Sequence, residues 1–385
     1  MADPSQPMTD SIQSYSQSFA FLSEEPSLAK RFDQARKALN HHYPFLSRIA
    51  AVLYDPDSDL LKTFIHSSDD NPLQWYAAPL THSPSLVAIK VSRRPRIVND
   101  LSRLAGAKTH TTAIRRGGYL ASYTLPVYHQ QHFIGFLFLN SSEKNVFQGG
   151  QLQLFDAVAN LLGQAMVQQI SEVRTLAGAV QTIQEISQKR DNETGGHLKR
   201  MAAYARLIAL ELAPQWQLSD EFIEYLYLFA PLHDVGKIAI PDQILLKPGP
   251  LNDAEYAIMK THTEEGRKII EGMLHHLNLS HIEHTEMLIS VVEDHHEKHN
   301  GSGYSRGLQG EHIPLAARIV AVADIFDALT SRRPYKEAWG NLRAIAQLQQ
   351  LAGSLLDEEC VAALCRNLEQ ITAIQQQFSE EPLTR

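Results

Sequence analysis

The stretch HHEKHNGSGYSRGL, residues 295–308, decides which kind of fold this chain has. Two adjacent histidines and a glutamate lead into a glycine-rich turn with a tyrosine at its tip. Such a stretch is either a solvated surface turn or a pair of metal ligands beside a substrate loop. The second interpretation requires further ligand residues, spaced so that helices bring them together. The rest of the chain therefore decides between an ordinary loop and a helical bundle around metal ions.

Ligand-type side chains recur in the same part of the chain, where 11 of its 18 histidines lie between residues 197 and 312. Glu193 and His197 are four residues apart, so on a helix they share one face. The pair His233-Asp234 is a common dipeptide, and it gains weight only from these neighbours. Further histidines follow at His262, His295 and His296.

A carboxylate in an apolar segment adds to this set. Asp324 lies within ARIVAVADIFDAL, where an ionised carboxylate is costly to bury unless it is paired or bound to metal. Asp327, three residues on, is the weaker candidate. Singly, each residue has an ordinary structural explanation, but together they favour two or three metal ions. Nitrogen and carboxylate ligands suit iron, manganese or zinc, and neighbouring ions can activate water for phosphoester hydrolysis.

Composition excludes several classes of protein. The formal net charge of -8 argues against a general electrostatic grip on nucleic acid. No stretch of about 18 apolar residues is present, so no membrane span is expected. The two cysteines, Cys360 and Cys365, cannot form a disulfide framework and suit a reducing compartment. We therefore expect a cytoplasmic protein without direct DNA binding.

The first part of the chain mixes helix and strand signals. Residues 1–23 are rich in serine and glutamine and are expected to be disordered. The segment SYTLPVYHQQHFIGFLFLN, residues 122–140, predicts a hairpin that turns near Gln130-Gln131. With a helical pattern before the strands and another after them, residues 24–160 predict an α+β domain. The other strand signals are RIAAVLYD, LLKTFIH and RPRIVND.

Residues 161–190 predict one continuous linker helix. Apolar residues recur there at four- and three-residue steps, which makes a narrow seam suited to a partner helix. We expect a homodimeric coiled coil; the alternative is that the seam packs on its own domain. Residues 191–372 are almost entirely helical in pattern and predict an all-α domain, followed by a flexible tail over 373–385. The seam consists of Leu162, Met166, Val173, Leu176, Val180 and Ile183.

Four ordered segments resemble the HD-GYP phosphodiesterases, a branch of the HD superfamily. The resemblance covers about residues 191–340. It implies an all-α bundle with a di- or trinuclear centre that hydrolyses cyclic di-GMP to pGpG, GMP or both. The segments are ETGGHLKRMAAYA (193–205), HDVGKIAIPDQILLKPGPL (233–251), HHEKHNGSGYSRGL (295–308) and ARIVAVADIFDALTSRRPYKEA (317–338).

The resemblance also implies roles for individual residues. Asp234 is expected to bridge two metal ions, and Glu193 goes with a third. The expected cofactor is two or three transition-metal ions, iron or manganese. The implied catalytic residues are His233, Asp234 and Lys237. The implied substrate-binding residues are Lys237, Tyr304, Arg333 and Lys336. The implied metal ligands are Glu193, His197, His233, Asp234, His262, His295, His296 and Asp324.

Two departures from the family pattern leave an alternative open. Ser305 stands where the family has proline, which would stiffen the loop by fixing φ. The stretch over residues 263–294 is longer than usual and contains four unmatched histidines. We interpret it as a surface insertion; the alternative is a cap over the cleft. The alternative function is a cyclic-dinucleotide receptor with weak or no hydrolysis. A di-iron oxygenase fits less well, because Lys237, Arg333 and Lys336 suit phosphate.

The α+β domain resembles a GAF domain over roughly residues 24–168. The resemblance depends on the order of the strands, with PRIVNDL before the central loop and LPVYHQQHFIGFLFLN near the end. It implies either regulation by a small ligand or a ligand-free dimerisation module. A thioether-linked bilin is excluded, because no cysteine lies in this region. The chain as a whole is expected to be a multidomain protein with a GAF-like domain, a long connecting helix and an HD-GYP bundle.

Overall fold

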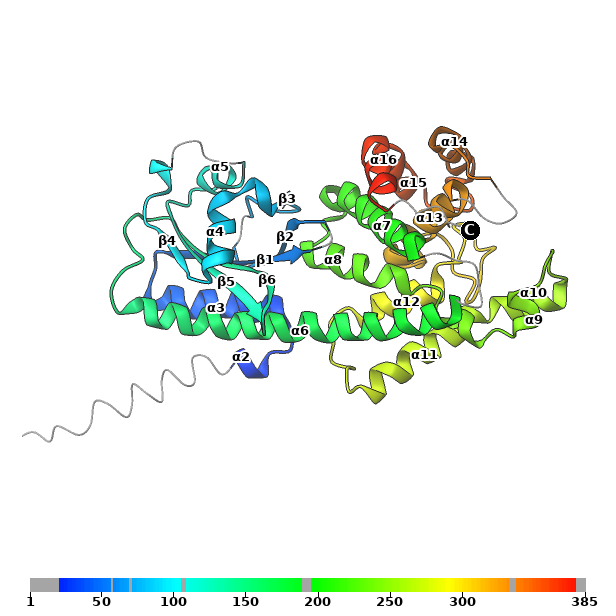
Figure 1. Ribbon diagram of the computed structural model, residues 1–385, viewed down its shortest axis with the longest axis horizontal. Coiled ribbons are helices and arrows are strands. Elements are labelled where there is room, and N and C mark those ends of the chain that lie inside the picture. Colours follow the sequence, from blue (N-terminus) through cyan, green and yellow to red (C-terminus); the bar gives the residue numbers. More distant parts are fainter. Residues whose placement is uncertain are drawn as a thin grey trace, which may run out of the picture. The chain divides into compact units, whose positions relative to one another are not determined.

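A computed structural model divides the chain into two compact units, residues 1–171 and 172–385 (Figure 1). Residues 1–20 and 379–385, most of the predicted disordered segment and half of the predicted tail, lie outside the described residues. The first part of the predicted tail, residues 373–377, is helical. Within the described residues, no helix combines the length and apolar content needed to cross a membrane. The structure describes residues 21–56, 58–68, 71–104, 109–188, 195–331 and 337–378.

The first unit is built on a six-stranded antiparallel sheet with the strand order β3-β2-β1-β6-β5-β4. The predicted hairpin is confirmed: β5 and β6 are joined at Gln130, whose φ of 53° lies in the left-handed region. The short strand β3 carries no alternating pattern and was not predicted. The strands are β1 (Leu46–Asp55), β2 (Leu60–His66), β3 (Ala77–Pro79), β4 (Arg96–Val98), β5 (Ala121–His129) and β6 (His132–Ser141).

Helices cover both faces of this sheet, which is why β1 and β6 bury side chains on both sides (Figure 1). On one face lies α3 (Leu28–His42), which is capped by Ser27 and buries one residue per turn, namely Leu28, Phe32, Ala35 and Leu39. On the other face lie α4 (Pro84–Ser92) and α5 (Thr109–Arg116). Short pieces are α2 (Phe21–Glu24), η1 (Leu80–His82) and η2 (Leu101–Arg103).

The connecting helix α6 (Gln151–Gln188) begins ten residues before the predicted start at 161. The predicted seam is not open to a partner helix along its described length. Its side chains Leu162, Met166, Val173, Leu176 and Val180 are each 0% exposed within the single chain. That burial agrees with the alternative in which the seam packs on its own chain. The side chain of Ile183 lies outside the described set.

The second unit is all-α in its described part, as predicted. Its central helix is α7 (Gly195–Trp216), which packs against α8, α13, α15 and α16. The other helices are α8 (Asp220–Phe229), η3 (Ala230–Leu232), η4 (Val235–Ala239), α9 (Asp242–Leu245), α10 (Asp253–Lys260), α11 (His262–His276), α12 (Thr285–Asp294), η5 (Gly310–His312), α13 (Leu315–Thr330), α14 (Asn341–Leu351), α15 (Glu358–Cys365) and α16 (Leu368–Gln377).

The interpretation of residues 263–294 as a surface insertion is wrong. These residues form most of α11 and all of α12, which pack on each other and bury Ile270, Leu274, Leu288 and Val291. Only the connection over 277–284 lies between them. The four unmatched histidines do not indicate the structure of this stretch, whereas its apolar residues at helical spacing predict two packed helices.

Candidate metal centre

The His233-Asp234 pair lies in a turn between two short 3₁₀ helices, η3 and η4. The backbone there gives the two neighbouring side chains different directions. His233 is 0% exposed, and its Nε2 atom lies 3.1 Å from Asp234 Oδ2. Both side chains therefore reach the same interior point of the bundle.

Seven of the eight predicted ligands come together in two adjoining groups. Within each group the possible ligand atoms lie within 4.8 Å of one another. The first group comes from the η3–η4 turn, α11 and the end of α12; the second comes from α7, the same turn and α13. The first group is Asp234, His262, His295 and His296, and the second is His197, His233 and Asp324.

Asp234 lies between the two groups. Its Oδ1 atom is 3.3 Å from His262 Nε2 and 3.7 Å from His295 Nε2, whereas its Oδ2 atom faces His233. Asp324 Oδ1 lies 4.0 Å from Nε2 of both His197 and His233. One carboxylate thus offers an oxygen to each group, as a bridging ligand would.

Hydrogen bonds at the far ring nitrogens orient the imidazoles. His233 Nδ1 lies 3.0 Å from the Ala230 carbonyl, His262 Nδ1 2.8 Å from that of Met259, and His295 Nδ1 3.0 Å from that of Val291. A carbonyl can only accept, so Nδ1 carries the proton and Nε2 presents its lone pair to the centre. This is the arrangement found for histidines that bind metals.

The atoms that face the centre lack other partners. Among the described residues, Nε2 of His233, His262 and His295 and Oδ1 of Asp234 are buried without a hydrogen bond. Buried polar atoms are normally satisfied, so several orphaned acceptors around one point require an explanation. Divalent cations fit this set of nitrogen and carboxylate donors, because each would satisfy several of these atoms at once.

The pKa values of the histidines at this site favour the binding of cations. Burial lowers the pKa of His295 to about 4 and also lowers the pKa of His296, so both rings are neutral at pH 7. Burial opposes protonation of His233 too, but the Asp234 carboxylate outweighs it and raises the pKa of His233 to about 9. A cation at this point would take the place of that proton.

Asp327 is not one of the grouped ligands; it contacts His197, which is one of them, on the ring nitrogen that faces away from the centre. It is 0% exposed, and its Oδ2 atom lies 2.7 Å from His197 Nδ1. Arg200 donates to the same carboxylate through Nε at 2.7 Å and Nη2 at 3.1 Å. Burial opposes ionisation, but the bonds from His197 and Arg200 lower the pKa of Asp327. Sequence reasoning ranked Asp327 as a weaker ligand, whereas the structure makes it the residue that orients His197.

Two glycines set the distance between the η3–η4 turn and α11. A Cβ atom on Gly236 would lie 1.8 Å from the His262 carbonyl oxygen and 2.5 Å from the Gly266 nitrogen. A Cβ atom on Gly266 would lie 2.6 Å from a Val292 methyl carbon. Backbone therefore packs directly on backbone beside Asp234 and His262, and no larger residue fits at Gly236 without moving one of them.

The loop after the histidine pair is anchored by two buried carboxylates. Glu297, 2% exposed, accepts hydrogen bonds from the backbone nitrogens of Arg306 at 2.6 Å and Gly307 at 2.8 Å. Asp294, 1% exposed, accepts two bonds from the Arg306 guanidinium, at 3.0 and 2.8 Å. These contacts tie the two residues that follow Ser305 back to Asp294 and Glu297. Sequence reasoning missed them, although the acidic residues on either side of His295-His296 were a usable signal.

Ser305 itself is a weak point of this loop, because its buried hydroxyl has no hydrogen-bond partner among the described residues. We expect Ser305→Pro to remove that unsatisfied group, restrict the unfolded chain, and stabilise the fold by about 0.4–1 kcal/mol. For a domain of this size the unfolding temperature should rise by about 1–4 °C, measured by calorimetry.

Conversely, Glu297→Ala should release the loop and raise KM for substrate about tenfold or more, because a charged acceptor of two backbone bonds is lost. Bound metal should stay unchanged, and Ser305→Pro should restore part of the lost affinity in the double variant. The matched control is Glu311→Ala, an exposed glutamate just after the loop. If Glu297→Ala lost bound metal as well as raising KM, a role confined to the loop would be contradicted.

Aromatic rings and lysines lie beside the centre. Tyr304 packs on His296, with ring centroids 4.9 Å apart, and Lys237 Nζ lies 2.8 Å from Asp234 Oδ2. Lys260 Nζ lies 5.8 Å from the Tyr304 ring centroid and 5.3 Å from that of Tyr256, which is 49% exposed. Sequence reasoning missed Tyr256 and Lys260; their i,i+4 spacing just before His262 was the available signal.

Three predicted residues cannot be placed. Glu193, expected to go with a third metal, lies outside the described residues, and so do the expected phosphate ligands Arg333 and Lys336. The described part of the chain therefore accounts for seven of the predicted metal ligands and for Lys237 and Tyr304.

Comparisons with known proteins agree with this architecture. Residues 181–360 match the HD domain family, and residues 28–166 match the GAF domain family. Among curated relatives, the cyclic di-GMP phosphodiesterase response regulator RpfG of Xanthomonas campestris is 46% identical over 190 residues, which cover 49% of this chain and 47% of that protein. The predicted two-domain organisation, a GAF-type domain followed by a helical HD domain, is confirmed.

Two proteins of Vibrio cholerae are also similar. A cyclic di-GMP phosphodiesterase is 40% identical over 215 residues, which cover 54% of this chain and 43% of that protein. A 3'3'-cGAMP-specific phosphodiesterase 2 is 38% identical over 202 residues, which cover 52% of this chain and 35% of that protein. This chain spans half or less of the length of each of these relatives.

Proposed function

Because a GAF domain occupies residues 28–166 and an HD domain residues 181–360, we propose that this chain is a metal-dependent phosphodiesterase that hydrolyses cyclic di-GMP. The observation that carries the proposal is the pair of histidine and aspartate groups joined by Asp234. Similarity to curated cyclic di-GMP phosphodiesterases supports the choice of substrate. The proposed ligands are the seven residues of the two groups, with Glu193 as an eighth.

The metal ions, the cationic side chains and Tyr304 would each have a separate role in the proposed reaction. Two or three ions of iron or manganese, when bound, would lower the pKa of a water and offset phosphate charge. Lys237 would place its ammonium near a phosphate oxygen, together with Arg333 and Lys336. Burial raises the pKa of Tyr304, so its phenol stays protonated and can donate to substrate. Four of the seven ligands are buried, whereas Asp234, His296 and Asp324 are only partly buried, so the centre would be reachable by substrate on their side.

The decisive experiment is incubation of the purified chain with Mn(II) or Fe(II) and cyclic di-GMP, followed by chromatography of the products. We expect pGpG, GMP or both, and no product after a chelator has removed the metal. The alternative, a receptor with weak or no hydrolysis, predicts that the nucleotide binds and that no product forms with any metal.

Substrate choice is assigned here to Tyr256, Lys260 and Tyr304. Bases stack on aromatic rings, and a lysine beside the stack can donate to the O6 and N7 acceptors of guanine. Adenine has no O6 acceptor, because it carries an amino group at that position. Lys260→Met should therefore lower the selectivity for cyclic di-GMP over cyclic di-AMP roughly tenfold or more in kcat/KM. Lys268→Met, an exposed lysine on α11, is the control. Unchanged selectivity in Lys260→Met would refute this assignment.

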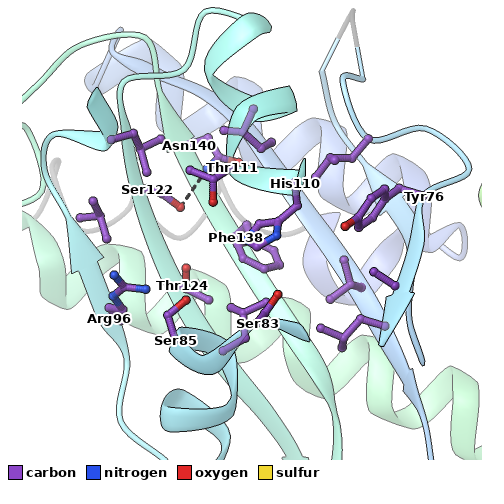
Figure 2. A pocket seen from close by; sticks show the side chains of 18 of the residues that line it. Tyr76, Ser83, Ser85, Arg96, His110, Thr111, Ser122, Thr124, Phe138 and Asn140 are labelled. Atoms are coloured by element: carbon purple, nitrogen blue, oxygen red, sulfur yellow. Dashed lines mark hydrogen bonds between the residues drawn. The ribbon is translucent and has the colours of Figure 1, made fainter. Parts of the chain in front are cut away.

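The GAF domain is proposed to regulate the enzyme by binding a small ligand, for which the first unit has a cavity (Figure 2).

A homodimer is also proposed. Since the described seam of α6 is buried, the partner would have to bind another surface. Light scattering of the purified chain tests that point. A reducing compartment such as the cytoplasm completes the proposal, because both cysteines are free thiols.

A further inference from the structure

A cavity of about 110 Å³ lies in the first unit, between the sheet and the helices α4 and α5 (Figure 2). Much of its wall is apolar, with Phe138 on the sheet and side chains such as Val52, Leu61, Leu86 and Ile114 around it. A cavity of roughly 150 Å³ is known to accept benzene. At about 110 Å³ this one is smaller but of the same order, so it suits a compact apolar body no larger than that.

One end of the cavity is closed by polar groups that bond to one another. Asn140 accepts from the Arg48 guanidinium at 3.0 Å and donates to Ser122 Oγ at 3.0 Å. The same guanidinium donates to Asn71 Oδ1 at 3.0 Å. These side chains hold the strands and the loop together, so we assign them to the wall rather than to a ligand.

Two other hydroxyl side chains that line the cavity, Thr124 and Ser83, differ from these. Thr124 is 6% exposed and Ser83 7% exposed, and neither hydroxyl makes a hydrogen bond within the described part of the chain. Arg96 lies directly opposite Thr124 in the β4–β5 pair, so the two side chains share one face of the sheet. Figure 2 shows Arg96, Thr124 and Ser85 close together below Phe138.

The charge at this end is positive. The Arg96 guanidinium makes no ion pair with any described residue, and no acidic side chain is found among the described residues that line the cavity. Ser83 also occupies the N-cap position of α4 without capping it, and it lines the same cavity. A guanidinium and two buried hydroxyls in one cavity suit the oxygens of an anion.

We propose that this cavity binds a small organic monoanion, a carboxylic acid with a compact apolar body, whose carboxylate is held by Arg96, Thr124 and Ser83. The inference deepens the regulatory part of the proposed function by naming the class of ligand. A single free guanidinium balances one negative charge, which favours a carboxylate over a phosphate dianion. The apolar wall around Phe138 accommodates the rest of the molecule.

The test uses the full chain and calorimetric titration with two probe pairs, benzoate with benzamide and isovalerate with isovaleramide. At least one acid should bind saturably and about 10- to 100-fold more tightly than its neutral amide, because the charged hydrogen bonds are lost in the amide. Arg96→Met should abolish that preference, and Thr124→Val should reduce it. Arg94→Met, an exposed arginine that does not line the cavity, should leave it intact.

Three outcomes would overturn the inference: neither acid binds, the amides bind as well as the acids, or Arg96→Met keeps the preference. Inorganic phosphate is included, and tighter binding of phosphate than of both acids would also reject the carboxylate assignment. Unfolding temperatures of each variant show whether the fold is retained, and Thr124→Val provides a second readout if Arg96→Met does not fold. Binding is measured without turnover, so failure here is distinguishable from failure of the phosphodiesterase.

Discussion

Asp234→Asn is expected to strip the protein of most of its bound transition metal and to abolish turnover of cyclic di-GMP. The carboxylate offers Oδ2 to His233 and Oδ1 to His262 and His295, so one substitution weakens both groups. An amide has no net charge, and its nitrogen would direct protons toward the site. The loss of activity should well exceed the roughly 10–100-fold that follows loss of a residue which only orients a ligand.

Elemental analysis and the product assay measure the two effects on the same preparation. Asp253→Asn is the matched control, because this exposed aspartate at the start of α10 undergoes the same chemical change away from the centre. Circular dichroism should be unchanged in both variants. Full metal content together with full activity in Asp234→Asn would remove the basis of the proposed function.

The second large effect is expected at Asp327. Asp327→Ala leaves the Arg200 guanidinium buried without its carboxylate, and breaking a buried pair in this way typically costs 3–5 kcal/mol. Since about 1 kcal/mol corresponds to 2–4 °C for a domain of this size, the unfolding temperature of the HD domain should fall by roughly 6–20 °C. His197 also loses the acceptor at its Nδ1 atom, so metal affinity should fall about 10- to 100-fold.

These two consequences of Asp327→Ala can be separated. In the double variant Arg200→Met with Asp327→Ala no buried charge is left unpaired, so stability should partly recover while the metal affinity stays low, because His197 still lacks its acceptor. The effect also depends on pH in a defined direction. The pKa of Asp327 is lowered in the folded state, so its stabilisation is complete above the unfolded value near 4 and is lost as the pH falls below it. A gap in unfolding temperature between the wild-type chain and Asp327→Ala that does not narrow as the pH falls below 4 would contradict this origin.

The sequence predicts well those features that depend on local pattern. The hairpin over 121–141 and the all-α character of the second unit follow from alternation and helical spacing, and both are confirmed in the described residues. Candidate ligands such as His233 and Asp324 could be named because metal chemistry needs few residue types. Their separation of 4.0 Å, from Nε2 to Oδ1, is consistent with that choice.

Features that depend on packing could not be read from the pattern. The seam residue Leu176 has the spacing of a coiled coil, but spacing does not say whether the covering surface belongs to the same chain. Asp327 looks like a spare ligand until His197 and Arg200 are seen on either side of it. The Glu297 carboxylate accepts from backbone nitrogens nine and ten residues away, and backbone partners leave no trace in side-chain composition.

The contact between Gly236 and Gly266 has a consequence for how this centre could change over evolution or in design. Where backbone lies on backbone, no rotamer change can widen or narrow the gap, so the cage around Asp234 and His262 has nearly fixed dimensions. We therefore expect changes of substrate to arise at the rim, at residues such as Tyr256, Lys260 and Ser305, rather than in the cage. New substrates would be acquired by altering the entrance while the inner geometry is inherited unchanged.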